Sequence, residues 1–177
     1  NIDELNGIPS IDAKGYFVTS PFVDSHFHLD ATLSYGIPRV NQTGTLLEGI
    51  KLWGELKPSL TGDALKDRAR KLCQWAIARG TLAIRSHVDI SDPSLLAVEA
   101  MLDIQNEYRP WLDLQLVAFP QDGLIRAGSK NNMNRALELG VEVVGGIPHF
   151  ERTMEEGTES IRYLCELAAT KGLQVDM

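Results

Sequence analysis

The sequence predicts an α/β protein whose parallel sheet of about five strands forms part of a (β/α)8 TIM-type barrel. Runs typical of strands alternate with amphipathic stretches at intervals of roughly 30 residues, which indicates repeated βαβ units. Polar residues at the C-terminal ends of separate expected strands favour a barrel over an open sheet, because barrel active sites are built from many strand ends. These residues are His28, Asp89, Gln121 and His149. A complete barrel needs about 250 residues, so we expect the 177 residues to be a truncated barrel.

The individual elements follow from capping residues and from the spacing of apolar side chains. Thr61 and Thr153 are typical N-cap residues, and Glu156 completes a candidate capping box with Thr153. Pro93 is expected at the first position of a helix, where its missing N–H costs nothing, and Gly172 is expected to end one. We therefore expect strands over 21–28, 81–90, 112–119, 141–147 and 173–177, and helices over 43–56, 63–79, 93–108, 131–139 and 154–172.

The composition is that of a globular protein that is acidic overall. The chain is 44% hydrophobic with a formal charge of −7, which argues against nucleic-acid or anionic-membrane partners because both reward basic patches. A small neutral substrate is compatible with this charge. Cys73 and Cys165 fall at helical positions among apolar neighbours, so we expect buried, reduced thiols and a cytoplasmic location. The sequence shows neither a membrane span nor a signal peptide, and the missing initiator Met suggests that residues precede Asn1.

Two histidines separated by one residue end the first expected strand. Side chains alternate along a strand, so His26 and His28 should share one face while Val23, Phe27 and Leu29 occupy the other. Imidazole suits zinc and iron, and two imidazoles on one face can share a metal ion, although a catalytic site needs about three protein ligands. The alternative is a strand that carries two solvated histidines.

The segment Pro-Phe-Val-Asp-Ser-His-Phe-His-Leu-Asp at 21–30 resembles the first-strand metal motif of the amidohydrolase superfamily. Within that superfamily the chain resembles the bacterial cytosine deaminases most. The resemblance also rests on Asn-Gln-Thr-Gly-Thr-Leu-Leu-Glu-Gly-Ile at 41–50, His-Val-Asp at 87–89, Val-Ala-Phe-Pro-Gln at 117–121 and Ile-Pro-His-Phe-Glu at 147–151. The superfamily commonly has glycine where this chain has Pro21, but the cytosine deaminase branch is similar to this sequence there too.

The resemblance implies a domain organisation and part of a site. Residues 1–17 would be the handover from a mostly missing β-sandwich, and residues 18–177 the first part of a metal-dependent hydrolase barrel. It implies one divalent metal ion, iron or zinc, held partly by the two histidines of the motif. It also implies that Gln121 and Leu46 contact the substrate, through the amide and through the pocket wall respectively. A metal-ligand His, a catalytic Glu, a further His and an Asp would lie beyond Met177.

Other polar residues have two interpretations each. Asp24 and Asp30 could orient an imidazole or be solvated carboxylates. His87 and Asp89 lie two apart on one strand, so they could form a polar wall of the pocket or a buried His–Asp pair. Two further residues at a strand end, His149 and Glu151, could line the pocket or form a buried ion pair. Gln121 could be an ordinary loop amide and Leu46 a core residue, and Trp53 is interpreted as packing.

The function that the resemblance implies is hydrolytic deamination of an aminopyrimidine, most simply cytosine to uracil with release of ammonia, a pyrimidine-salvage reaction. A related amidohydrolase that acts on isocytosine, isoguanine or a triazine is the first alternative, because pocket changes on one barrel change the substrate. A non-catalytic metal-binding or interaction fragment is the second. Open sheet edges would expose pairing groups, so we expect a homo-oligomer whose other partner is a small molecule, with no nucleic acid and no membrane.

Overall fold

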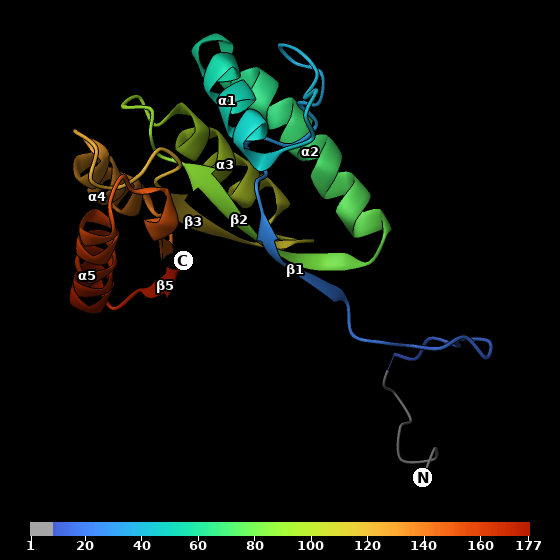
Figure 1. Ribbon diagram of the computed structural model, residues 1–177. Coiled ribbons are helices and arrows are strands. Elements are labelled where there is room, and N and C mark those ends of the chain that lie inside the picture. The colour runs from blue at the N-terminus through green and yellow to red at the C-terminus, as the bar shows by residue number, and fades with distance from the viewer. Residues whose placement is uncertain (1–8) are drawn as a thin grey trace.

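The computed structural model describes residues 9–177, in which five parallel strands form one curled sheet. The strands lie side by side in the order of the sequence, helices α2 to α5 cover the outside of the curl, and α1 lies at the C-terminal ends of the strands (Figure 1). This arrangement is that of a half-barrel and confirms the predicted partial TIM-type fold. The strands are β1 (Phe22–Phe27), β2 (Thr81–Asp89), β3 (Asp113–Phe119), β4 (Val143–Gly145) and β5 (Gln174–Asp176).

The helices begin and end close to the positions predicted from their caps. The Thr61 hydroxyl accepts a hydrogen bond from the Ala64 amide, and the Thr153 hydroxyl accepts one from the Glu156 amide, so both threonines are N-caps. Gly172 ends its helix in the left-handed conformation with a φ of 65°. The helices are α1 (Leu46–Leu56), α2 (Gly62–Ala78), α3 (Leu96–Tyr108), α4 (Ser129–Leu139) and α5 (Met154–Lys171), with 3-10 turns η2 (Lys57–Ser59) and η3 (Pro148–Phe150).

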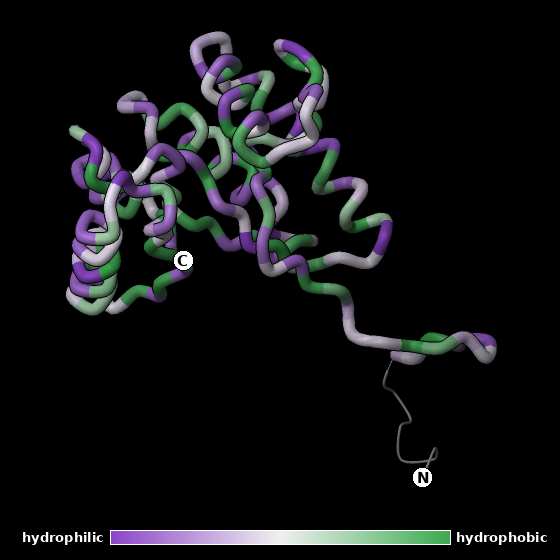
Figure 2. The backbone as a smooth tube through the Cα atoms, in the orientation of Figure 1, coloured by the Kyte–Doolittle hydropathy of each residue, from purple (hydrophilic) through white to green (hydrophobic). Residues whose placement is uncertain are grey.

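Side chains of β2 and β3 divide between the helix layer and the inside of the curl. Ile84 and Val88 point outward and are buried against the helices, and hydrophobic residues follow these strands in Figure 2. Arg85, His87 and Asp89 alternate with them and therefore face inward. Burying each large aliphatic side chain of the outer layer stabilises the fold by about 1.5–3 kcal/mol. The inward row carries the polar chemistry.

Three local predictions were wrong. Helix α3 begins at Leu96 and not at Pro93, because the Asp92 carboxylate accepts the Ser94 amide and closes a turn that leads into Leu95 at a φ of 57°. The Glu156 carboxylate accepts the Arg152 amide, so it does not complete a capping box with Thr153. Cys165 is exposed on α5, whereas Cys73 is buried as expected.

Strand β1 contains a β-bulge. Asp24 is paired with Ile84 but Phe27 is paired with Ser86, so three steps along β1 correspond to two along β2. Phe27 therefore faces the helix layer as predicted. Val23 is paired with Ala83 on the inward row, which contradicts the prediction that it shares a face with Phe27. Regular alternation fails here because the extra residue changes the phase of the strand.

Residues 9–21 precede the barrel and run away from it (Figure 1). The predicted turn is present, with the Lys14 amide bonded to the Asp12 side chain and Gly15 at a φ of 80°. The adjoining apolar side chains Tyr16 and Phe17 are 81% and 91% exposed. The expected handover segment 1–17 is described from residue 9 only, and its first part lies outside the described residues. No helix within residues 9–177 is long and apolar enough to cross a membrane.

Candidate active site

A cavity of about 550 Å³ lies at the C-terminal ends of the strands. Strands β1, β2, β3 and β5 supply its floor, and helix α1 and the segment around η3 supply its walls. Seven of the predicted site residues meet here, as expected for a barrel site. The predicted residues that line the cavity are His26, His28, Asp30, Leu46, His87, Gln121 and His149. Asp24 does not line it, and Asp89 lines a smaller neighbouring space beside Trp53 and Lys57.

Three imidazoles gather on the floor of the cavity. The ring centroid of His26 lies 4.0 Å from that of His87 and 5.4 Å from that of His28. His28 and His87 are 5.5 Å apart, and Phe119 meets both rings edge-on. The bulge in β1 leaves His26 inward beside the β2 row, so the geometry brings together the histidines of two strands.

The surroundings of His28 and His87 favour neutral imidazole. Burial, together with the positive charge that His87 and His26 would carry, lowers the pKa of His28 to about 4. Burial also lowers the pKa of His87, although its contact with Asp176 opposes that shift. Neutral imidazoles retain a nitrogen lone pair near pH 7, which is the form that ligates metal ions.

The carboxylate of Asp176 at the end of β5 completes the cluster. Its Oδ1 lies 3.1 Å from His87 Nε2, and its Oδ2 accepts a hydrogen bond of 2.8 Å from Arg85 Nη1. Burial alone would raise the pKa of Asp176, but the His87 and Arg85 contacts outweigh it and the pKa is lowered. The predicted alternative of a His87–Asp89 pair is therefore wrong, because His87 pairs with Asp176.

The cluster fits a divalent metal ion. His26, His87 and Asp176 each offer a ligand atom, and these atoms all lie within 4.8 Å of one another. His87 Nε2 lies 3.1 Å from Asp176 Oδ1, and His87 Nδ1 is buried without a hydrogen-bond partner among the described residues, so this imidazole has a ring nitrogen that no protein group satisfies. Imidazole and carboxylate together suit zinc or iron. The predicted ligand His28 stands at the edge of this set, at the ring distances given above.

The carboxylates near the histidines bind backbone amides. Asp30 accepts the Asp89 amide at 2.9 Å and the Ala31 amide at 2.9 Å, and burial raises its pKa to about 7. Asp24 accepts the His26 amide at 3.3 Å on the outer row of β1. Neither carboxylate holds an imidazole among the contacts of the described residues, so their predicted orienting role is replaced by a role in shaping the backbone.

Asp89 fastens helix α1 to the end of β2. Its side chain is 5% exposed, and its Oδ2 accepts a hydrogen bond of 2.7 Å from Trp53 Nε1. Lys57 Nζ lies 3.2 Å from the same carboxylate and 2.8 Å from Asp122 Oδ2 on the loop after β3. Sequence reasoning interpreted Trp53 as packing and missed Lys57, because a contact 36 residues apart leaves no local pattern.

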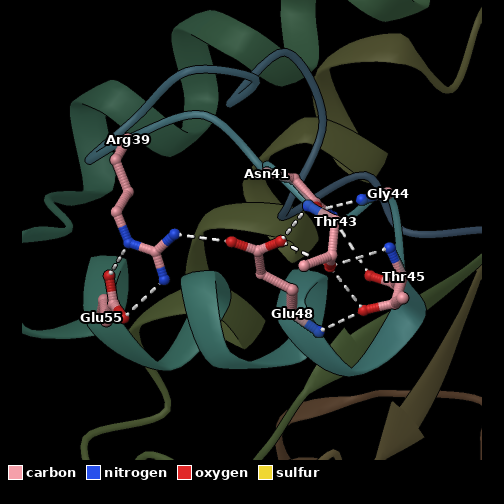
Figure 3. Close-up of polar contacts among 7 residues, drawn as sticks. All are labelled: Arg39, Asn41, Thr43, Gly44, Thr45, Glu48 and Glu55. Carbon is pink, nitrogen blue, oxygen red and sulfur yellow. Dashed lines mark hydrogen bonds and ion pairs between the residues drawn. The ribbon is translucent and has the colours of Figure 1, made fainter.

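The loop before α1 is held by a second polar cluster (Figure 3). Glu48 accepts hydrogen bonds from the Thr43 amide and hydroxyl at 2.7 and 2.6 Å and from Arg39 at 2.7 Å. Arg39 also donates to Glu55 at 3.0 and 3.1 Å. These contacts fix the start of α1, where Leu46 is 73% exposed beside the cavity. Leu46 is therefore a cavity residue and not a core residue.

The fold and site together define an α/β-barrel protein with a histidine-rich cavity at the strand ends. Residues 10–177 match the model of the Amidohydrolase family. The chain belongs to this family.

Solved structures similar to this chain include 5-methylcytosine deaminase from Klebsiella pneumoniae, liganded with phosphonocytosine. That structure is 41% identical with a TM-score of 0.90, over 97% of this chain and 43% of the deaminase. N-isopropylammelide isopropylaminohydrolase from Burkholderia multivorans is 26% identical with a TM-score of 0.73, over 88% of this chain and 39% of that protein.

A curated relative is N-isopropylammelide isopropyl amidohydrolase from Pseudomonas sp. (strain ADP), 29% identical over 94% of this chain and 42% of its own length. Another is the uncharacterized protein YahJ from Escherichia coli (strain K12), 32% identical over 79% of this chain and 31% of its own length. The chain thus spans less than half the length of these proteins.

Proposed function

We propose that this chain is the first part of a metal-dependent barrel hydrolase that deaminates an aminopyrimidine, most simply cytosine to uracil and ammonia. The observation that supports this most is the likeness to 5-methylcytosine deaminase, at 41% identity and a TM-score of 0.90 over 97% of the chain. The activity belongs to the full-length protein, since the chain spans 43% of that deaminase.

The residues around the cavity support the chemistry. The Gln121 side chain lines the cavity, and its amide offers both a donor and an acceptor, which matches the N–H and C=O of a pyrimidine lactam edge. Leu46 and Phe119 supply apolar walls that exclude water around a flat ring. A substrate held by these three residues would direct its amino-bearing carbon toward the imidazoles.

The hydrolysis divides between the substrate, a water molecule and the histidine cluster. His26, His87 and Asp176, with His28 at the edge of the set, would hold a divalent metal ion, which would supply the Lewis acidity that makes water a nucleophile near neutral pH. Water adds to the amino-bearing ring carbon, the C–N bond then breaks, and protonated nitrogen leaves as ammonia. The proton-transfer groups are assigned to the part of the barrel that follows β5.

A second candidate substrate is a substituted triazine such as N-isopropylammelide. Two related proteins, at 29% and 26% identity, are named for hydrolysis of that compound. A triazine also carries a lactam edge beside an amine-bearing carbon, so Gln121 would serve both substrates. Isocytosine and isoguanine are further members of the same substrate class.

The test is hydrolysis by the full-length protein of cytosine, 5-methylcytosine, isocytosine, isoguanine and N-isopropylammelide, measured as release of ammonia from the first four compounds and of isopropylamine from the last. We expect the highest kcat/KM for cytosine or its 5-methyl derivative. Gln121→Leu should reduce that value by roughly 5- to 150-fold, because one or more buried partners worth about 1–3 kcal/mol are lost. The exposed Gln42→Leu is the matched control and should remain at the wild-type level.

A preference for N-isopropylammelide would move the assignment to the triazine hydrolases. Bound metal without turnover of any of the five compounds would favour a non-catalytic metal-binding protein. An unimpaired Gln121→Leu enzyme would show that a different group recognises the ring.

A further inference from the structure

The loop that carries Gln121 follows β3 and has two backbone donors outside any helix or strand. Leu124 is fully buried, and its amide donates a hydrogen bond of 2.6 Å to Glu151 Oε1. The Ile125 amide approaches the same oxygen at 3.4 Å. Glu151 itself stands on the next loop of the barrel, directly after η3. One carboxylate therefore joins two neighbouring strand-end loops.

Gly123 is shaped to this carboxylate. Its φ is +96°, a conformation that glycine adopts without strain. A Cβ at this position would lie 2.8 Å from Glu151 Oε2 and 3.3 Å from the carboxyl carbon. The close approach of Gly123 to Glu151 and the hydrogen bonds from the Leu124 and Ile125 amides are separate observations. Both place the Glu151 carboxylate against this loop.

The other end of the loop is held as well. The Asp122 amide donates to Ser91 Oγ at 3.2 Å, and the Asp122 carboxylate pairs with Lys57 Nζ at 2.8 Å. The Gln121 amide N–H donates to the Phe119 carbonyl at 2.9 Å. Gln121 thus stands beside an anchored residue and two positions before the glycine that lies against Glu151.

We propose that Glu151 is a positioning residue: its carboxylate holds the 121–125 loop and thereby sets the direction of the Gln121 amide in the cavity. The effect on substrate rests on the proposed function, whereas the effect on the loop does not. A displacement of a recognition group by about 1 Å lowers catalytic efficiency by up to about 100-fold. Because Gln121 contacts substrate and transition state alike, the loss should fall on KM more than on kcat.

The test compares full-length variants by hydrogen exchange and by kinetics with cytosine. In Glu151→Ala we expect exchange at the Leu124 amide to rise at least about tenfold, because its acceptor is lost. KM should rise about tenfold or more while kcat stays within about threefold. Glu151→Gln keeps a side-chain oxygen at the same distance from the backbone. This variant should therefore restore the wild-type exchange rate at Leu124 and the wild-type KM. The exposed carboxylate variant Glu166→Ala is the matched control.

A second variant pair tests the geometry. Gly123→Ala should impair KM because its Cβ meets the carboxylate, and adding Glu151→Ala should then cost less than it does in the wild type. Unchanged Leu124 exchange in Glu151→Ala, or a Glu151→Gln variant as impaired as the alanine, would overturn the proposal. A wild-type protein that leaves cytosine intact would refute the proposed function, while the exchange data would still decide the loop contact.

Discussion

Trp53→Phe tests how firmly helix α1 is docked over the cavity. The change keeps an aromatic ring but removes the indole N–H that donates to Asp89 Oδ2 at 2.7 Å. Asp89 is 5% exposed, so water cannot readily replace the missing donor, although the Ser91 amide and Lys57 remain as partners. The perturbation is therefore the loss of one buried hydrogen bond to a charged group.

Hydrogen bonds to charged groups contribute about 1.5–3 kcal/mol, which corresponds to roughly 10- to 150-fold in an equilibrium constant. The docked and undocked states of α1 should shift by that factor in the full-length protein. Hydrogen exchange at amides in the second half of α1 measures this opening directly. KM should rise in parallel, because the same helix presents Leu46 to the cavity.

Trp75→Phe on α2 is the matched control, since Trp75 is 51% exposed. Hydrogen exchange at the α1 amides of the Trp75→Phe variant should equal that of the wild type. The reasoning fails if Trp53→Phe leaves α1 protection unchanged, because the Asp89 contact would then add nothing to docking. It fails equally if both tryptophan variants loosen α1 to the same extent.

Two other predictions concern metal and pH. His26→Ala and His28→Ala should each lose bound metal and activity together, whereas Gln121→Leu should keep wild-type metal content, as measured by elemental analysis after dialysis; retained metal in both histidine variants would contradict the site. Bonds from the Thr43 hydroxyl and amide and from Arg39 lower the pKa of Glu48 from 4.5 to about 2. Their stabilisation is complete above about pH 4.5 and is lost as pH falls toward 2, so unfolding measured between these values should depend on pH more in wild type than in Glu48→Gln.

The regular features of the fold could be predicted from local pattern. Thr61 and Thr153 cap helices as expected, and Gln121 and His28 reach the same cavity because parallel strands end at one rim. Pro93 was misleading because the competing signal is an Asp92 turn, which defers the helix. The start of a helix could thus be predicted from the sequence wherever a single capping or turn residue determined it.

The contacts between distant strands could not be predicted. Arg85 and His87 meet Asp176 across the curl, at a separation of 89 or more residues, and no periodicity encodes which strand ends face one another. Glu151 was given two interpretations, pocket lining or a buried ion pair, and the structure supports neither because its partners are backbone amides. The alternation of strands and helices along the chain did place Asp176 near the end of an expected strand. This position was the only hint in the sequence that Asp176 could belong to the site.

The bulge in β1 divides that strand into two parts that can change separately. Val23, below it, and Ser25, within it, line the lower hollow of the curl with Arg85. His26, at the upper end of the bulge, faces the cavity, and Phe27 resumes the pairing with β2. The extra residue interrupts the alternation of side chains along β1. Substitutions at the lower hollow therefore need not change the orientation of the imidazoles above it. A designer could therefore redesign the base of this barrel while keeping the upper strand end as a fixed module.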